Sequence, residues 1–191
     1  MDAMDLIAKL SDKNEPVLVH GKRVARLACA IAQRMDYSGE GIKIIHHAAV
    51  VHDIGKLGMP REIIYKPDTL NREEMAVIRK HPEFGYSVLK QIMPSESAVA
   101  RIALQHHERL DGSGYPFGLK AKDIIQMAKI VSVADVIDTM IYAQVYRPAL
   151  SVDEAVGEIK QNSGILYDAE VVAASLWVMK DEKRRHRAHK K

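Results

Sequence analysis

The sequence places two metal-binding side chains, His52 and Asp53, directly after an apolar stretch and just before Gly55. Neighbouring helical residues point about 100° apart, so both side chains reach one metal only where a helix ends and its last turn loosens. Glycine permits such an ending. Because a carboxylate has two oxygens and an imidazole offers one free lone pair, Asp53 can also bridge two metals. The pair is weak evidence by itself, but it requires a helix terminus at this point.

Further candidate ligands are spread widely along the chain. Seven of the nine histidines lie between His20 and His107, and Asp135 interrupts an apolar run in which a helix face would otherwise carry no charge. A buried, unpaired carboxylate is costly, so an acid in such surroundings usually has a cation as its neighbour. This pattern indicates a metal site assembled from several helices. The candidate ligands are His20, His52, Asp53, His81, His106, His107 and Asp135.

The length and composition suit one soluble, globular domain. A chain of 191 residues with 47% hydrophobic and 28% charged residues is long enough to bury one sizeable core. The single cysteine, Cys29, lies in an apolar run and is expected to pack as a small hydrophobic side chain. No disulfide can form within the chain, no signal peptide is evident, and no apolar run has the ~18 residues of a transmembrane helix. We therefore expect a cytoplasmic protein.

The net charge of +3 is set by the C-terminus. Residues 180–191 hold seven basic and two acidic side chains, a balance of +5, so the remaining chain carries −2. A domain that is not basic is not expected to bind DNA. We expect residues 180–191 to be a disordered tail, although it has the charge to touch RNA, an anionic membrane or a partner protein.

The apolar periodicity predicts helices almost throughout and no strand, which gives an all-α fold. Asn71 with Glu74, and Ser151 with Glu154, have the spacing of a capping box at a helix start. We expect a helical lead-in over residues 1–15, one domain over 16–179, and the tail. Complete helices are expected over residues 2–10, 16–35, 42–52, 71–80, 124–142 and 169–179. A further helix follows residue 80 and ends near 93, another begins at Ser95 or Ser97 and ends at the His106–His107 pair, and another begins at 151. Residues 38–41 are expected to be a connector and 55–70 a loop.

Several short motifs follow one another in a fixed order. They are His52-Asp53-Ile54-Gly55-Lys56, Met59-Pro60, Lys66-Pro67, Asn71-Arg72-Glu73-Glu74, His81-Pro82, His106 to Arg109, Asp111-Gly112, Gly114-Tyr115-Pro116, Val133-Ala134-Asp135 and Tyr146-Arg147. In this order, from about Val17 to Met179, the chain resembles the HD-GYP family, a branch of the HD-domain metal-dependent phosphohydrolases. The resemblance implies an HD-domain helical bundle with a metal site in its core.

The same resemblance implies an activity and a set of metal ligands. The family is known for hydrolysing cyclic di-GMP to linear pGpG, with slower onward cleavage to GMP, by means of a hydroxide that bridges two metals. Two such metals bind a phosphodiester together and stabilise its pentavalent phosphorus. Iron and manganese are the metals expected, and zinc and nickel suit the same ligands. By resemblance, one metal is held by His20, His52, Asp53 and Asp135, and Asp53 bridges to a second held by His81, His106 and His107.

Other residues are expected to contact the cyclic dinucleotide. Lys56 follows the ligands by one turn and would neutralise a phosphate or assist the leaving oxygen, which makes it catalytic together with Asp53. By resemblance, Arg147 and the residue at Gln144 grip the substrate. The segment Gly114, Tyr115 and Pro116 either shapes the substrate mouth or is a tight turn that needs glycine dihedrals.

The remaining polar side chains near these motifs have structural interpretations. His46 and His47 match no ligand position of the family and are expected to pack or to lie at the surface. Asp138 either orients a ligand from behind or has a surface or capping role. Glu108 and Arg109 are expected to pair with each other or with Asp111 and so brace the loop, and Asp111 is expected to have a similar structural role.

The chain departs from the family pattern at two positions. Members proposed to hold three metals carry a glutamate four residues before the first histidine, where this chain has Pro16. We therefore expect two metals rather than three. The family segment Arg-Pro-Tyr-Arg is here Gln144-Val145-Tyr146-Arg147, so its first arginine, a bidentate donor with a fixed charge, is absent.

Three functions remain open from the sequence. The first is an active cyclic di-GMP phosphodiesterase. The second is a catalytically weak binding module that acts through protein contacts, which the loss of an arginine at Gln144 favours. The third is a hydrolase of another cyclic or mononucleotide. Regulation by a partner protein in trans is compatible with each, and so is a dimer.

Overall fold

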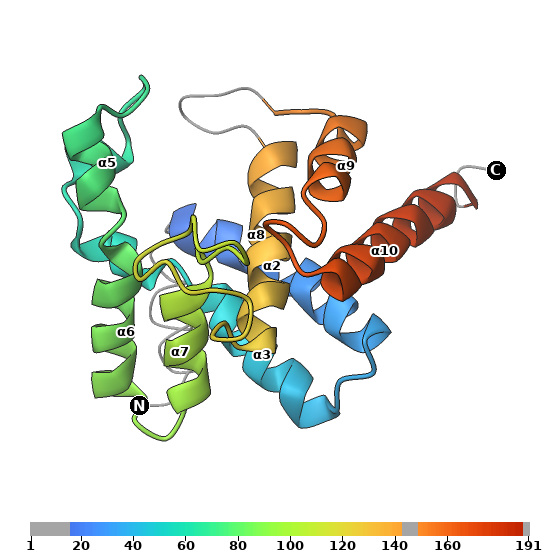
Figure 1. Cartoon of the computed structure of the whole chain (residues 1–191), viewed down its shortest axis with the longest axis horizontal. Helices are drawn as coiled ribbons and strands as arrows, with labels where there is room; N and C mark the ends of the chain where they lie inside the picture. The colour runs from blue at the N-terminus through green and yellow to red at the C-terminus, as the bar shows by residue number, and fades with distance from the viewer. Residues whose placement is uncertain (1–15, 143–148, 189–191) are drawn as a thin grey trace.

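The computed structural model describes residues 16–142 and 149–188, and its regular elements are all helices (Figure 1). The described residues contain no strand, only two isolated bridges that pair Asp111 with Lys120 and Ser163 with Tyr167. The all-α prediction is therefore confirmed. The helix predicted over residues 2–10 and the substrate residues Gln144 and Arg147 lie outside the described residues.

Three helices cross at the centre of the molecule (Figure 1). They are α2 (Pro16–Arg34), α3 (Gly39–Val51) and α8 (Gln126–Ile141). α2 packs against both of the others, and α3 also contacts α8. Their apolar faces meet in one core cluster that includes Val24, Ile31, Ile45, Ile130 and Ile137, all fully buried. The apolar faces of the three helices thus pack into the same core, and this packing fixes the positions of the polar ligand residues that the helices carry.

Further elements flank this centre on two sides (Figure 1). On one side lie η1 (Ile54–Gly58), α4 (Arg61–Ile64), α5 (Arg72–Ile78), α6 (His81–Ile92) and α7 (Ser97–Gln105). On the other side lie α9 (Val152–Gln161) and α10 (Ala169–Ala188). The first group carries four of the candidate ligands at or near its helix ends. The second closes the core behind α8 and α2.

Both predicted capping boxes are present. Asn71 and Glu74 exchange side-chain and backbone hydrogen bonds at the start of α5, and Ser151 and Glu154 do the same at α9. The predicted connector before α3 is wrong, because Ser38 caps that helix through the N–H of Gly41 and residues 39–41 are helical. The segment after Gly55 that we expected to be a loop contains η1 and α4.

The C-terminal helix ends later than expected. We predicted that it ends near Met179 and that a disordered tail follows, but α10 runs to Ala188. The physical reason lies in the composition of this segment: it lacks glycine and proline, its lysines, arginines and glutamate favour helix, and basic side chains near a helix C-terminus interact favourably with the dipole.

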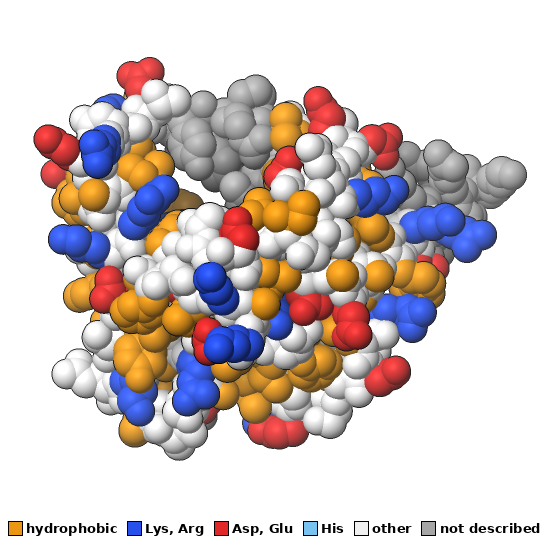
Figure 2. Space-filling view, viewed as in Figure 1, with side chains coloured by type: hydrophobic (Ala, Val, Ile, Leu, Met, Phe, Trp, Pro, Cys, Tyr) orange, Lys and Arg blue, Asp and Glu red, His pale blue; other side chains and the backbone are white. Residues whose placement is uncertain are grey.

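Acidic and basic side chains are interspersed over the face drawn in Figure 2, without a large region of one sign. This mixture agrees with the small net charge of the chain outside the C-terminal segment. Among the helices of residues 16–142 and 149–188, none is long and apolar enough to span a membrane.

Candidate metal centre

The structure brings the seven predicted ligands together from five helices. α2 supplies His20, the end of α3 supplies His52 and then Asp53, and α6 begins with His81. The end of α7 supplies His106 and His107, and the middle of α8 supplies Asp135. Most of these side chains sit at a helix terminus, where the backbone direction changes and adjacent residues can converge.

The ligand atoms form two groups. In the first, His20, His52 and Asp135 each offer an atom within 4.8 Å of the others, and in the second Asp53, His81, His106 and His107 do the same. This division matches the two ligand sets that the family resemblance implies, apart from the position of Asp53 between them.

Asp53 faces both groups with different oxygens. Its Oδ2 lies 3.6 Å from His52 Nε2 and 3.9 Å from His20 Nε2. Its Oδ1 lies 3.1 Å from His81 Nε2 and 3.8 Å from His106 Nε2. A carboxylate that bridges two metals needs this arrangement, in which each oxygen lies next to a different set of histidine nitrogens.

A repeated local hydrogen bond presents the same nitrogen of three histidines to the centre. In each ring Nδ1 lies 2.7 Å from the carbonyl oxygen three residues earlier, and since a carbonyl can only accept, Nδ1 carries the proton. The three pairs are His52 with Ala49, His81 with Ile78, and His106 with Ala103. Each Nε2 therefore keeps its lone pair and points at the ligand groups, as a metal-binding imidazole requires.

Two buried polar atoms of the centre lack a hydrogen bond. Among the described residues, His52 Nε2 and Asp53 Oδ1 are fully enclosed and have no hydrogen-bond partner. An unsatisfied buried acceptor costs about 1–3 kcal/mol, and more when it is charged. His52 Nε2 belongs to the first ligand group and Asp53 Oδ1 faces the second, so a cation in each group would remove this cost. The donor set therefore fits divalent transition metals.

The protonation states of the buried ligands also suit a metal. Burial alone would raise the pKa of Asp53, but the nearby positive charge, that of Lys56 above all, holds this pKa well below its usual range. Burial lowers the pKa of His106 to about 4 and lowers the pKa of His107 as well. Near neutral pH the carboxylate is therefore ionised and these rings are neutral, which are the ligand forms.

His20 differs because two carboxylates contact its ring. Nε2 lies 2.9 Å from Asp135 Oδ1 and Nδ1 lies 2.8 Å from Asp138 Oδ2. Burial acts to lower the pKa of His20, but the hydrogen bonds to Asp135 and Asp138 together raise it to about 10. The negative charge that holds a proton here also favours a metal cation at Nε2.

Asp138 and Arg23 support His20 from behind. Asp138 is buried, and Arg23 Nε and Nη2 each donate to its carboxylate at 2.9 Å. Of the alternatives for Asp138, the structure favours orientation of a ligand over a surface role. Sequence reasoning missed Arg23, yet a signal was there: it follows His20 by three residues, as Asp138 follows Asp135, so each pair shares a helix face.

Lys56 lies at the edge of the centre. Its Nζ is 2.6 Å from Asp53 Oδ2, and its side chain is 27% exposed. It extends from η1, whose close approach to α6 depends on Gly55, because a Cβ at that position would overlap the carbonyl oxygen of His81. The position predicted for a phosphate-binding cation is thus partly open and adjacent to the metal ligands.

The loop after His107 is braced by Glu108. The carboxylate of Glu108 is buried and accepts the backbone N–H groups of Phe117 and Leu119, both at 2.8 Å. The predicted pairing of Glu108 with Arg109 is wrong. Arg109 instead donates to Ser132 Oγ at 2.8 Å and to backbone carbonyls, because the carboxylate is already used by the loop.

Gly114 and Tyr115 occupy different environments within this loop. A Cβ at Gly114 would overlap the backbone at Arg109 and His107, so glycine is needed there for packing. The ring of Tyr115 stacks on His107 with centroids 4.6 Å apart and an interplanar angle of 28°. The prediction of glycine dihedrals applies to Gly112, whose φ is 85°, and not to Gly114, which close packing requires. Tyr115 lies against a candidate ligand, and Pro116 follows it through a cis peptide bond.

Two other predicted features fall away from the centre. His47 pairs with Glu96 at 3.1 Å, and His46 is exposed, as expected for residues that are not ligands.

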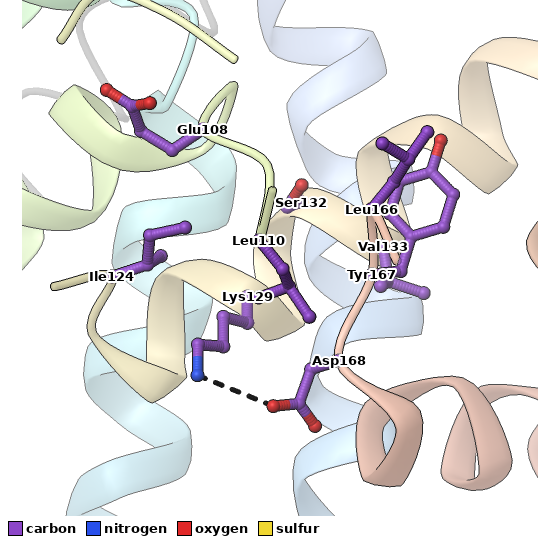
Figure 3. A pocket seen from close by; sticks show the side chains of 9 residues that line it. All are labelled: Glu108, Leu110, Ile124, Lys129, Ser132, Val133, Leu166, Tyr167 and Asp168. Carbon is purple, nitrogen blue, oxygen red and sulfur yellow. Dashed lines mark hydrogen bonds and ion pairs between the residues drawn. The ribbon is translucent and has the colours of Figure 1, made fainter. Parts of the chain in front are cut away.

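A small cavity of about 10 Å³ lies where Lys129 approaches Asp168 at 3.4 Å (Figure 3). Because this volume holds at most about one water, the cavity is too small for a substrate.

Comparison with known proteins places the chain in a family. A family model described as HD domain matches residues 5–171. The chain is 42% identical over 163 residues to a cyclic di-GMP phosphodiesterase of Thermotoga maritima, an alignment that covers 85% of this chain and 44% of the relative. It is 34% identical over 167 residues to 3'3'-cGAMP-specific phosphodiesterase 3 of Vibrio cholerae, covering 87% of this chain and 36% of the relative. The chain thus spans less than half of the length of these curated relatives.

A solved structure has the same fold. An HDG"Y"P protein from Bdellovibrio bacteriovorus superposes with a TM-score of 0.71 over 86% of this chain and 52% of that chain, at 23% sequence identity. With the ordered motifs from His52 to Asp135 and the family model over most of the sequence, these comparisons show that the chain belongs to the HD domain family, in its HD-GYP branch.

Proposed function

We propose that this protein is a metal-dependent phosphodiesterase that hydrolyses cyclic di-GMP to linear pGpG. The observation that carries the proposal is the position of Asp53, whose two oxygens address two separate ligand groups while Lys56 contacts it from the open side. The similarity to the cyclic di-GMP phosphodiesterase of Thermotoga maritima supports the choice of substrate.

The proposed centre holds two divalent metals, of which iron and manganese suit the histidine and carboxylate donors. His20, His52, Asp135 and Asp53 would hold one, and Asp53, His81, His106 and His107 the other. When bound, such a pair draws negative charge from a phosphodiester and lowers the pKa of water near it.

The chain's own residues account for binding and orientation. The Nδ1 hydrogen bonds of the histidines at positions 52, 81 and 106 keep each Nε2 aimed inward, and burial excludes bulk water from the ligands. Lys56 is positioned to donate to a phosphate oxygen or to the leaving oxygen. In the reaction water supplies the oxygen that joins phosphorus, the bond from phosphorus to the 3′ oxygen breaks, and that oxygen gains a proton.

A second substrate is supported by one specific comparison. The relative from Vibrio cholerae that is 34% identical acts, by its name, on 3'3'-cGAMP. This molecule has the same ring of two phosphodiesters and differs in one base. The metal centre would bind the phosphodiester that both molecules share, so the centre itself would not discriminate between them.

The test is product chromatography after incubation of cyclic di-GMP, and in parallel 3'3'-cGAMP, with protein prepared anaerobically and loaded with iron or manganese. Metal content is measured on the same sample, and Asp53→Ala is the control. Appearance of pGpG that the control does not form supports the proposal. Protein with two metals per chain that turns over neither dinucleotide contradicts it.

A further inference from the structure

Among the described residues, three cationic side chains that contact the carboxylates or the loop of the metal centre are already paired. Lys56 pairs with Asp53, and Arg23 pairs with Asp138. Arg109 donates to Ser132 and to the carbonyl oxygens of His106 and Glu108. A further cation is Arg79, whose guanidinium lies 5.4 Å from the centre of the Tyr115 ring.

Arg79 differs from the others because it is exposed and forms no ion pair with a carboxylate of the described residues. Its guanidinium lies over the ring of Tyr115, and such a contact does not use the N–H donors in an ion pair. A cation that stacks on an aromatic ring keeps its charge and can bind an anion in the plane of its donors.

The position of Arg79 is fixed from both ends. Its backbone is the C-terminal cap of α5, directly after Ile78, whose carbonyl accepts the Nδ1–H of His81. Its side chain lies on Tyr115, and Tyr115 stacks on His107. Arg79 is thus one ring removed from the candidate ligands, on the side where the α5–α6 junction meets the loop (Figure 1).

A cyclic dinucleotide offers a second charged group that a cation near the metal centre can bind. The molecule carries two phosphodiesters on opposite sides of one ring, each with a negative charge. When one phosphate is at the metal centre beside Lys56, the other must lie outside the ligand groups. A suitable partner for that phosphate is an exposed cation, held near the edge of the centre, that no carboxylate of residues 16–142 or 149–188 pairs with, and Arg79 meets these conditions.

We propose that Arg79 binds the second phosphate of the cyclic dinucleotide and so distinguishes a substrate with two phosphodiesters from one with a single phosphodiester. This role rests on the proposed function, since it names a contact of that same substrate. Arg79 is a specificity-determining residue here, because it does not touch the phosphorus that reacts.

The experiment compares Arg79→Gln with the wild-type protein on two substrates. Cyclic di-GMP has two phosphodiesters, and bis(p-nitrophenyl) phosphate has one. We expect the KM for cyclic di-GMP to rise about tenfold or more, which corresponds to one lost charge-assisted hydrogen bond, with kcat within about twofold. The kinetics toward bis(p-nitrophenyl) phosphate should not change.

Two further variants exclude trivial causes. Arg72→Gln removes the same charge from an exposed position of the same helix, α5, and should leave KM and kcat unchanged for both substrates. Arg79→Lys keeps the charge but not the planar donor group, and should recover part of the lost affinity. Thermal melts and metal content verify that each variant folds and binds metal as the wild type does.

The outcomes are distinguishable. If Arg79→Gln raises the KM of both substrates equally, or of neither, the proposed contact is absent. If the wild type does not hydrolyse cyclic di-GMP, the proposed function fails, and the role of Arg79 is then decided by equilibrium binding of cyclic di-GMP to metal-loaded protein. An unchanged Kd in Arg79→Gln overturns it, and a Kd about tenfold higher supports it.

Discussion

Asp138 accepts the Nδ1 hydrogen of His20 at 2.8 Å while Arg23 grips the same carboxylate through Nε and Nη2. This contact places a carboxylate behind a candidate metal ligand, an arrangement that fixes the tautomer of the imidazole and raises its basicity. Arg23 also lies 4.0 Å from the centre of the Tyr142 ring, at the end of α8. One arginine therefore connects α2 and α8 at the metal centre.

The first prediction concerns this connection. Arg23→Gln removes the bidentate partner of Asp138, so His20 is held less firmly and the affinity for one of the two metals should fall by about 10–100-fold. Equilibrium dialysis against limiting Mn²⁺ measures the effect. Arg26→Gln, which removes a charge from an exposed position one turn away on the same helix, is the matched control. Equal metal affinity in the two variants would contradict the role of Arg23.

The second prediction concerns metal removal. His52 Nε2 and Asp53 Oδ1 are buried without a hydrogen bond, and a bound metal stabilises only the folded state that assembles them. Chelation should therefore lower the melting temperature, and added Mn²⁺ or Fe²⁺ should restore it in proportion to the logarithm of metal concentration. Scanning calorimetry of dialysed protein measures both changes. A melting temperature that does not respond to metal would argue against the centre.

The third prediction uses two glycines with opposite surroundings. A Cβ at Gly114 would overlap backbone atoms of Arg109 and Glu108, whereas Gly157 lies within α9 with nothing in reach. Gly114→Ala should reduce the free energy of unfolding by about 1–3 kcal/mol, and Gly157→Ala should increase it by up to about 1 kcal/mol. Urea denaturation gives both values. The loop packing described above is wrong if Gly114→Ala is as stable as the wild type.

The fourth prediction concerns pH in the absence of metal. The folded state lowers the pKa of His106 from 6.5 to about 4, so between these values the unfolded chain binds more protons and stability falls as pH falls. His20 has the opposite sign: its pKa rises from 6.5 to about 10, and its contribution is lost as pH rises through that window. These two contributions are both present near pH 6.5, so the free energy of unfolding of the chelated protein should be largest near this pH and fall toward pH 4 and toward pH 10.

A variant separates the acid side from the alkaline side. His106→Asn cannot be protonated, so its loss of stability between pH 6.5 and about 4 should be shallower than that of the wild type, while the alkaline side is unchanged. Urea midpoints measured across the pH range give the comparison. Identical acid slopes in the two proteins would show that His106 is not buried as a neutral ring.

Much of the fold could be predicted from the sequence because its signals are local. Apolar periodicity and the pairs Asn71–Glu74 and Ser151–Glu154 involve residues within one or two turns, and both capping boxes form as expected. Where a local signal was overlooked, the prediction failed. Ser38 caps α3, and the segment after Met179 continues α10 because its residues favour helix.

The sequence alone also determined the chemistry of the ligands, since the positions of histidine and aspartate in the ordered motifs name the donors. Only the tertiary structure decided how they are used: that Asp53 turns one oxygen to each group, that Arg23 holds Asp138, and that Glu108 binds the loop. These contacts depend on the crossing of α2 with α8 and on the turn after α7. Crossing geometry arises from packing between residues more than a hundred positions apart, which local periodicity does not encode.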